Sequence, residues 1–169
     1  MRKLSLIFVF SFILSVSAGA SDRIKGYGNS YWGMTPDEVV SAENGRAHKI
    51  NPPLEYYETV GAVGIDKVSI DTYDFKVVYQ FKNNNLVQVI VQSLNNKFES
   101  VNRMAFQSIE SLLTQKYGVP TYKEPYKEVV WVNLGTSINL SYTIIDGISN
   151  FVTVTYKPES EQVKKAENL

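Results

Sequence analysis

Residues 98–120 read FESVNRMAFQSIESLLTQKYGVP, and this stretch decides the fold because it is the longest segment with a helical period. Its apolar residues recur at steps of three and four, so they would share one face of a helix. They are Phe98, Val101, Ala105, Ile109, Leu112, Leu113 and Tyr117. A helix of about 20 residues, roughly 30 Å long, would need cover for that stripe, and the β-rich segments on either side are there to provide it.

Both ends of this helix carry signals. Asn96 is placed to accept hydrogen bonds from the first free amides, with Glu99 as its capping-box partner. Gly118 suits a left-handed cap after the last turn, and Pro120 prevents continuation. These signals predict a helix over residues 97–117.

The first twenty residues are typical of a signal peptide. Arg2 and Lys3 precede an apolar run from Leu4 to Val16, and Ala18-Gly19-Ala20 resembles a cleavage site. The run is shorter than the roughly 20 residues that span a bilayer, so we expect no transmembrane segment after cleavage. We expect an exported protein, periplasmic or extracellular, with residues 21–157 as one domain and residues 158–169 as a polar, flexible tail.

Composition excludes several classes of function. Removal of Arg2 and Lys3 would leave 15 basic residues against 17 acidic ones, a net charge near −2, which is unlike a nucleic-acid-binding protein. The chain has no cysteine and one histidine, so the usual zinc ligand sets cannot be filled. No residue pattern indicates a cofactor, and we expect none.

A short helix is predicted over residues 36–43. Thr35 is its N-cap, Pro36 occupies the first helical position, and Glu38 completes the capping box. Asn44 and Gly45 should end it. Beyond Pro52-Pro53, residues 54–60 read as a strand that Gly61 and Gly64 interrupt.

Alternating patterns predict the remaining strands. Residues 72–81 place Tyr73, Phe75, Val77, Tyr79 and Phe81 on one face, and residues 86–94 return after a loop at Asn83-Asn84-Asn85. After the long helix, residues 128–134, 137–145 and 150–156 read as strands, the last two joined by a turn at Asp146-Gly147.

The two halves follow a similar order of elements. Each has a helix ended by a glycine, a proline-containing stretch and then strands, which indicates two tandem α-β-β-β units. The fold class predicted is therefore α+β: a mostly antiparallel sheet of about six strands, with one long and one short helix packed on one face.

Residues 32–39, Trp-Gly-Met-Thr-Pro-Asp-Glu-Val, resemble the opening of many small exported bacterial proteins. The element order is similar to the β-lactamase-inhibitor-protein-like architecture and, more distantly, to the small lipoprotein of the outer-membrane β-barrel assembly machinery. This resemblance implies a binding or assembly role rather than catalysis. The chain lacks the lipidated cysteine of that lipoprotein, and no functional residue carries over, because the matching positions are structural.

Catalytic patterns are weak. His48 lies in a polar stretch and reads as an exposed loop residue rather than a base. Glu55 and Glu58 are three residues apart, so a strand would point them to opposite faces, against a glycosidase pair. Asp66, Asp71 and Asp74 lack the calcium-loop spacing. We predict no catalytic, metal or cofactor residue.

Aromatic residues are the better candidates for contact with a partner, because tyrosine and tryptophan bury a large area and keep a polar group. The alternative is that they pack in the core or at sheet edges. The candidates are Tyr27, Tyr31, Trp32, Tyr56, Tyr57, Tyr122, Tyr126 and Trp131.

The function predicted is therefore an exported, non-enzymatic binding module whose partner is another envelope or secreted protein. Two alternatives remain open from the sequence: an inhibitor of a secreted enzyme, and a carboxylate-dependent hydrolase.

Overall fold

The computed structural model describes residues 23–95 and 97–159. The expected signal peptide, residue 96 and residues 160–169 of the expected tail lie outside the described residues. The first half contains α1 (Pro36–Ala42), β1 (His48–Glu55), β2 (Val60–Ile70), β3 (Tyr73–Lys82) and β4 (Asn85–Ser93). The second contains α2 (Glu99–Tyr117), β5 (Tyr122–Glu124), β6 (Glu128–Asn133), β7 (Thr136–Ile145) and β8 (Ser149–Pro158).

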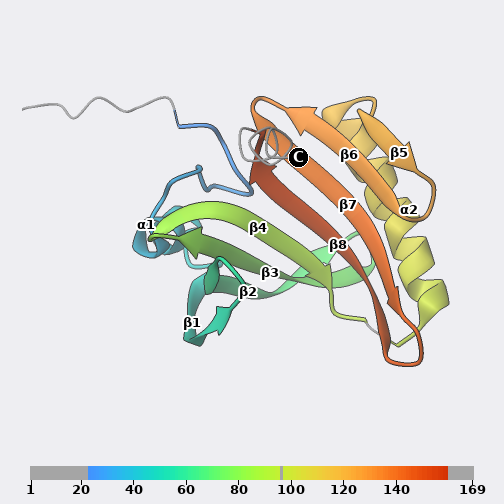
Figure 1. The fold of residues 1–169 in the computed structure, drawn as a ribbon, viewed down its shortest axis with the longest axis horizontal. Helices are drawn as coiled ribbons and strands as arrows, with labels where there is room; N and C mark the ends of the chain where they lie inside the picture. The colour runs from blue at the N-terminus through green and yellow to red at the C-terminus, as the bar shows by residue number, and fades with distance from the viewer. Residues whose placement is uncertain (1–22, 96, 160–169) are drawn as a thin grey trace, which may run out of the picture.

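All eight described strands form one antiparallel sheet in the order β1-β2-β3-β4-β8-β7-β6-β5 (Figure 1). Strand accounts for 51% of the structure and helix for 20%. The prediction of two tandem α-β-β-β units is therefore wrong: the protein is mostly β, and β4 pairs directly with β8 to join both halves in a single sheet.

The missed strands have local causes. Pro52 and Pro53, which precede the predicted strand, lie within β1, an edge strand where a missing N–H costs few sheet hydrogen bonds. Gly61 and Gly64, read as breaks, lie inside β2. A Cβ on Gly64 would lie 3.0 Å from Ile50 Cδ1, so the glycine lets β1 pack closely. The predicted strand over residues 54–60 is wrong, because it spans the turn between β1 and β2.

Cross-strand pairing separates the sheet into two faces. The core face carries rows of directly paired, buried residues, which the helices cover. One row runs Ile65, Val77, Val91, Val154, Leu140 and Val129; the next runs Val63, Tyr79, Val89, Tyr156, Ile138 and Trp131. Because side chains alternate along a strand, the residues between these rows point to the opposite side, which we call the open face.

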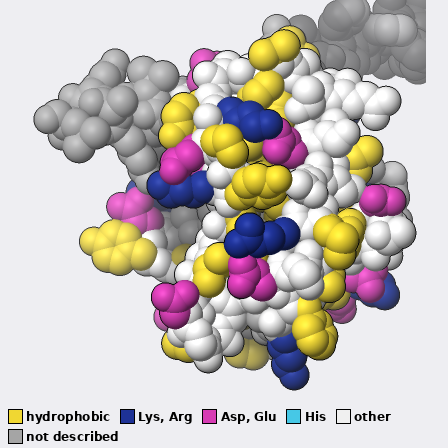
Figure 2. Space-filling view, turned by 90° about the vertical axis from the view of Figure 1, so that its right-hand side faces the viewer, with side chains coloured by type: hydrophobic (Ala, Val, Ile, Leu, Met, Phe, Trp, Pro, Cys, Tyr) yellow, Lys and Arg dark blue, Asp and Glu magenta, His cyan; other side chains and the backbone are white. Residues whose placement is uncertain are grey.

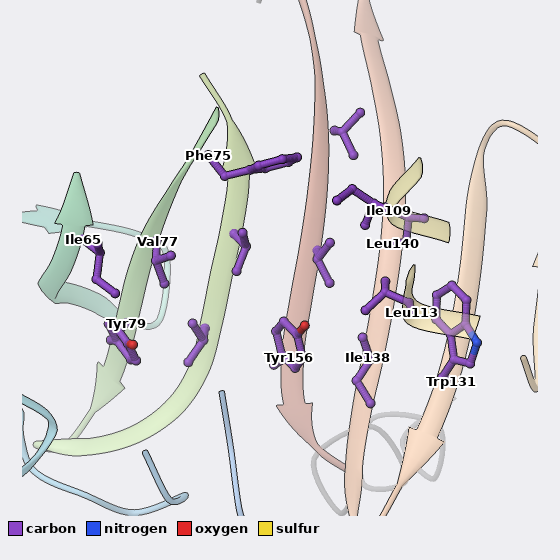
Figure 3. Packing of buried hydrophobic residues seen from close by; sticks show 14 of the residues in the cluster. Ile65, Phe75, Val77, Tyr79, Ile109, Leu113, Trp131, Ile138, Leu140 and Tyr156 are labelled. Atoms are coloured by element: carbon purple, nitrogen blue, oxygen red, sulfur yellow. The ribbon is translucent and has the colours of Figure 1, made fainter. Parts of the chain in front are cut away.

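Helix α2 packs on the core face across β6, β7 and β8, and Figure 3 shows Ile109 and Leu113 beside Leu140 and Trp131. Its buried side is rotated from the predicted stripe. Leu112 is 41% exposed and Phe98 is exposed, whereas Asn102 and Phe106 are buried. Asn102 Nδ2 donates to Asn150 Oδ1 (2.7 Å) and to the Asn150 carbonyl (2.9 Å). This buried polar contact requires Asn102 to face the sheet and so sets the rotation of α2 about its own axis.

The ends of α2 also differ from the prediction. The helix begins at Glu99 with Phe98 as N-cap and no side-chain cap, and Asn95 Oδ1 accepts from the Lys97 N–H (3.2 Å). Gly118 ends the helix with φ 84° and ψ −155°. The predicted positive φ is present, but that ψ lies outside the left-handed helical region and in one that is essentially restricted to glycine.

The solvent-exposed side of α2 carries both hydrophobic and charged side chains. Figure 2 views the side of the molecule that carries α2 and β5, and hydrophobic, basic and acidic side chains alternate across it. Arg103 pairs with Glu99, Lys123 pairs with Glu110, and the exposed Met104 lies on the same helix. No charge of one sign dominates this view, so it gives no indication of a nucleic-acid surface.

The capping box at Thr35 is confirmed. The Thr35 N–H donates to Glu38 Oε2 (2.7 Å), and the Glu38 N–H donates to Thr35 Oγ1 (3.4 Å). The hydrogen bond from the Thr35 N–H, together with Arg23, lowers the pKa of Glu38.

We expect Thr35→Ala to lower the free energy of unfolding by about 1 kcal/mol, measured by urea denaturation. Thr35→Ser keeps the oxygen and should match the wild type; equal losses in both variants would contradict the cap.

A second prediction concerns Gly118. We expect Gly118→Ala and Gly118→Asn each to destabilise the protein by about 1–3 kcal/mol, because neither side chain suits this φ and ψ. Asparagine tolerates the left-handed helical region. An asparagine variant as stable as the wild type in thermal unfolding would therefore show that the cap adopts that conformation instead.

Candidate functional site

The open face contains a continuous row of directly paired residues that crosses seven strands. It runs from Gly64 through Val78, Ile90, Thr155, Asn139 and Val130 to Tyr122. A second row runs from Lys76 through Gln92, Thr153 and Ser141 to Glu128 and Glu124. Hydroxyl and amide groups thus dominate the centre of this face, and these central residues are half-buried. The described helices both contribute to the core on the other side.

A hollow of about 440 Å³ lies at the β1–β2 end of this face. Its lining is Tyr56, Tyr57, Glu58, Thr59, Gln80, Gln88 and Ile90. The turn that carries the two tyrosines is closed by a hydrogen bond from the Tyr56 N–H to the Thr59 carbonyl (3.0 Å). We call this hollow the turn hollow.

Gln80 gives the turn hollow its polar floor. Its side chain is 2% exposed, and Thr59 Oγ1 lies 3.3 Å from its Oε1. Among residues 23–95 and 97–159, its Nε2 has no hydrogen-bond acceptor. Because this nitrogen is itself buried, Gln80 belongs to the interior beneath the turn hollow.

The structure divides the eight aromatic candidates. Trp32 and Trp131 are 8% and 1% exposed, and their indole N–H groups donate to Thr136 Oγ1 (2.9 Å) and to the Gly118 carbonyl (3.1 Å). Both belong to the core and cannot contact a partner.

The other six aromatic candidates lie in five separate places. Tyr56 and Tyr57 flank the turn hollow, and Tyr57 is fully exposed. Tyr122 lies in β5 at the far end of the open-face row, and Tyr31 is exposed beside Lys25. Tyr126 accepts a hydrogen bond from Gln107 of α2 (2.9 Å). The two ends of the open face therefore each hold exposed tyrosine, while Tyr27 lies elsewhere.

Tyr27 lines a second cavity, of about 350 Å³, on the core-face side; we call it the tyrosine pocket. It is bounded by the segment Lys25–Gly28, by Arg46, by the end of α2 and by the β6–β7 turn. The Tyr27 ring lies 5.1 Å from the Tyr156 ring and 6.2 Å from the Tyr79 ring. Burial raises the pKa of Tyr27 and of Tyr156, so both hydroxyls stay neutral at neutral pH.

The carboxylates and histidine singled out from the sequence do not converge. His48 Nε2 lies 3.5 Å from Asp66 Oδ1, with both side chains exposed, and Glu58 pairs with Lys82 (3.4 Å). Asp74 pairs with Lys67 (2.7 Å) and Asp71 accepts from Ser108. Within the described residues, no three histidine, cysteine or acidic side chains gather as a metal site.

Sequence reasoning did not identify the residues that matter most in the two cavities. Gln80, Gln88 and Ile90 were read only as strand residues, and Lys25, Arg46 and Lys116 were not considered together. The alternation in residues 86–94 places Gln88 and Gln92 on one face, and that in residues 137–145 places Asn139, Ser141 and Thr143 on one face. Both patterns point to the open face.

Comparisons with protein-family models, with curated proteins and with solved structures found no match to this chain. The resemblance suggested by residues 32–39 therefore stays a prediction. In the part of the chain that the structure describes, no helix is long and apolar enough to cross a membrane.

The division of the aromatics generates a prediction about stability. Trp131→Ala should lower the free energy of unfolding by about 3–5 kcal/mol, because it leaves a cavity beneath α2 and removes a hydrogen bond. Tyr57→Ala should leave it within about 0.5 kcal/mol of the wild type, because the side chain is exposed. Thermal or urea unfolding of the two variants measures the difference, and similar losses in both would contradict the assignment.

Proposed function

We propose that this chain is an exported, non-enzymatic binding module that holds a protein partner across its open face. The observation that carries the proposal is the run of hydroxyl and amide side chains across the centre of that face, with an exposed tyrosine at each end.

The chemistry of the open face favours a protein over other partners. Tyrosine combined with small polar residues such as serine and asparagine is typical of antibody binding surfaces, where the ring supplies area and the small polar groups supply adaptable hydrogen bonds. A nucleic-acid surface would instead carry clustered lysine and arginine. Charged residues of the second row lie to either side of its centre: Lys76 is on β3, and Glu128, on β6, accepts a hydrogen bond from Asn139.

The size of the face also suits a protein. Strands lie about 4.8 Å apart and rise about 3.3 Å per residue, so β3, β4, β8, β7 and β6 offer roughly 20 Å by 30 Å. That area, with the flanking tyrosines, approaches the roughly 800 Å² that each partner buries in an interface of standard size.

The test places a bulky charge at the centre of the open face. Thr153 is directly paired with Gln92 and Ser141, so Thr153→Arg should block docking there. Ser111 is exposed on α2, which packs on the core face, and Ser111→Arg is the matched control. The wild-type protein is used to capture its partner from the envelope of its own organism, and affinity is then measured with the purified partner.

We expect Thr153→Arg to weaken binding by at least about thirtyfold, which corresponds to the loss of one interface hot spot of about 2 kcal/mol, while Ser111→Arg binds as the wild type does. Tyr57→Ala should weaken it less. Equal binding by wild type and Thr153→Arg, loss of binding in the Ser111→Arg control, or no partner captured by the wild type would each count against the proposal.

A further inference from the structure

Three cations border the tyrosine pocket, and among residues 23–95 and 97–159 no carboxylate lines it. Lys25, Arg46 and Lys116 approach it from three segments that are far apart in the sequence. Three tyrosines, Tyr27, Tyr117 and Tyr156, form ring-bearing walls, and Leu134 and Ile138 add apolar surface. The cavity, about 350 Å³, falls in the size range of small-molecule sites.

One of the three cations is already balanced. Arg46 pairs with Glu43, which is fully buried and also accepts from the Asn29 N–H (2.9 Å). This contact holds the guanidinium at the rim and fixes the loop after α1, so Arg46 has a structural role.

The other two cations are not balanced. Among residues 23–95 and 97–159, neither Lys25 nor Lys116 forms an ion pair. The Lys116 ammonium lies 5.0 Å from the centre of the Tyr117 ring, which keeps it against the wall of the cavity. The pocket therefore has an excess of positive charge beside neutral tyrosines.

We propose that the tyrosine pocket binds a small organic anion: a molecule with a flat, ring-bearing body and a carboxylate or phosphate group. The rings and the apolar residues would contact the body, and Lys25 and Lys116 would hold the anionic group. The pocket lies on the core-face side, so this site is separate from the open face and does not depend on the proposed function.

The tyrosine and apolar walls of the pocket explain why an anion without a ring should bind only weakly. Lysine ammonium groups at the surface are well hydrated and bind simple anions weakly, so much of the affinity must come from the body that replaces water between the tyrosines. A neutral ring of the same size would fill the cavity but leave both ammonium groups without a partner. Charge and ring are therefore both required.

The experiment titrates the purified protein with four probes: phenyl phosphate, benzoate, inorganic phosphate and benzyl alcohol. Binding is followed by calorimetry and by the amide NMR signals of Gly26 and Gly28, which line the pocket. We expect phenyl phosphate or benzoate to bind about tenfold or more tightly than inorganic phosphate and benzyl alcohol. The tighter of the two anions identifies the charged group.

Variants distinguish specific binding in the tyrosine pocket from nonspecific attraction of anions to lysines elsewhere. The double variant Lys25→Gln, Lys116→Gln should lower the affinity for the anionic ring compound about tenfold or more. The control variant Lys97→Gln changes an exposed lysine just before the opposite end of α2 and should leave this affinity unchanged. Unchanged melting temperatures show that the variants are folded. Benzyl alcohol binding as tightly as the anions, an unaffected double variant, or no probe binding at 10-mM concentrations (about the weakest useful affinity) would overturn the proposal.

Discussion

The pairing of β4 with β8 is the contact on which the rest of the structure depends. Four directly paired positions, from Val89–Tyr156 to Gln92–Thr153, join the strands of the first half to those of the second. Because this pairing keeps the pleat in phase across the junction, buried rows continue from β2 to β6 without interruption. A slip of one residue would exchange the faces of an entire half, and both the core and the open face would be lost.

The same pairing separates the two candidate sites. The open face and the turn hollow lie on one side of the sheet, and the tyrosine pocket lies on the helical side. The second site also draws on residues at the ends of the helices: Arg46 lies in the loop after α1, and Lys116 lies in the last turn of α2. Buried polar contacts, such as that between Asn102 and Asn150, hold α2 in place over β8. Rigid placement of this kind favours binding sites that exist before a ligand arrives.

Local chemistry was predictable where a few neighbouring residues determine it. The capping box at Thr35, the positive φ angles at Asn83 and Asn84, and the turn at Gly147 all follow from short motifs. The number of strands was not predictable, because glycines inside β2 and prolines inside β1 serve close packing and an edge position that only the sheet creates. The rotation of α2 was missed since Asn102, a polar residue, lies on its buried side. The tyrosine pocket brings together segments over 100 residues apart, and no local pattern encodes that.

The two edge strands have a consequence for how the protein behaves at high concentration. At one edge, Pro52 and Pro53 remove N–H donors from β1, and at the other β5 is only three residues long. A neighbouring copy therefore finds few free backbone groups to which it could add a strand. The tyrosines and the exposed Val60 near these edges could otherwise favour growth into fibrils. Edge strands with few free backbone donors and acceptors therefore allow a β-rich chain to expose tyrosines for recognition and still resist aggregation.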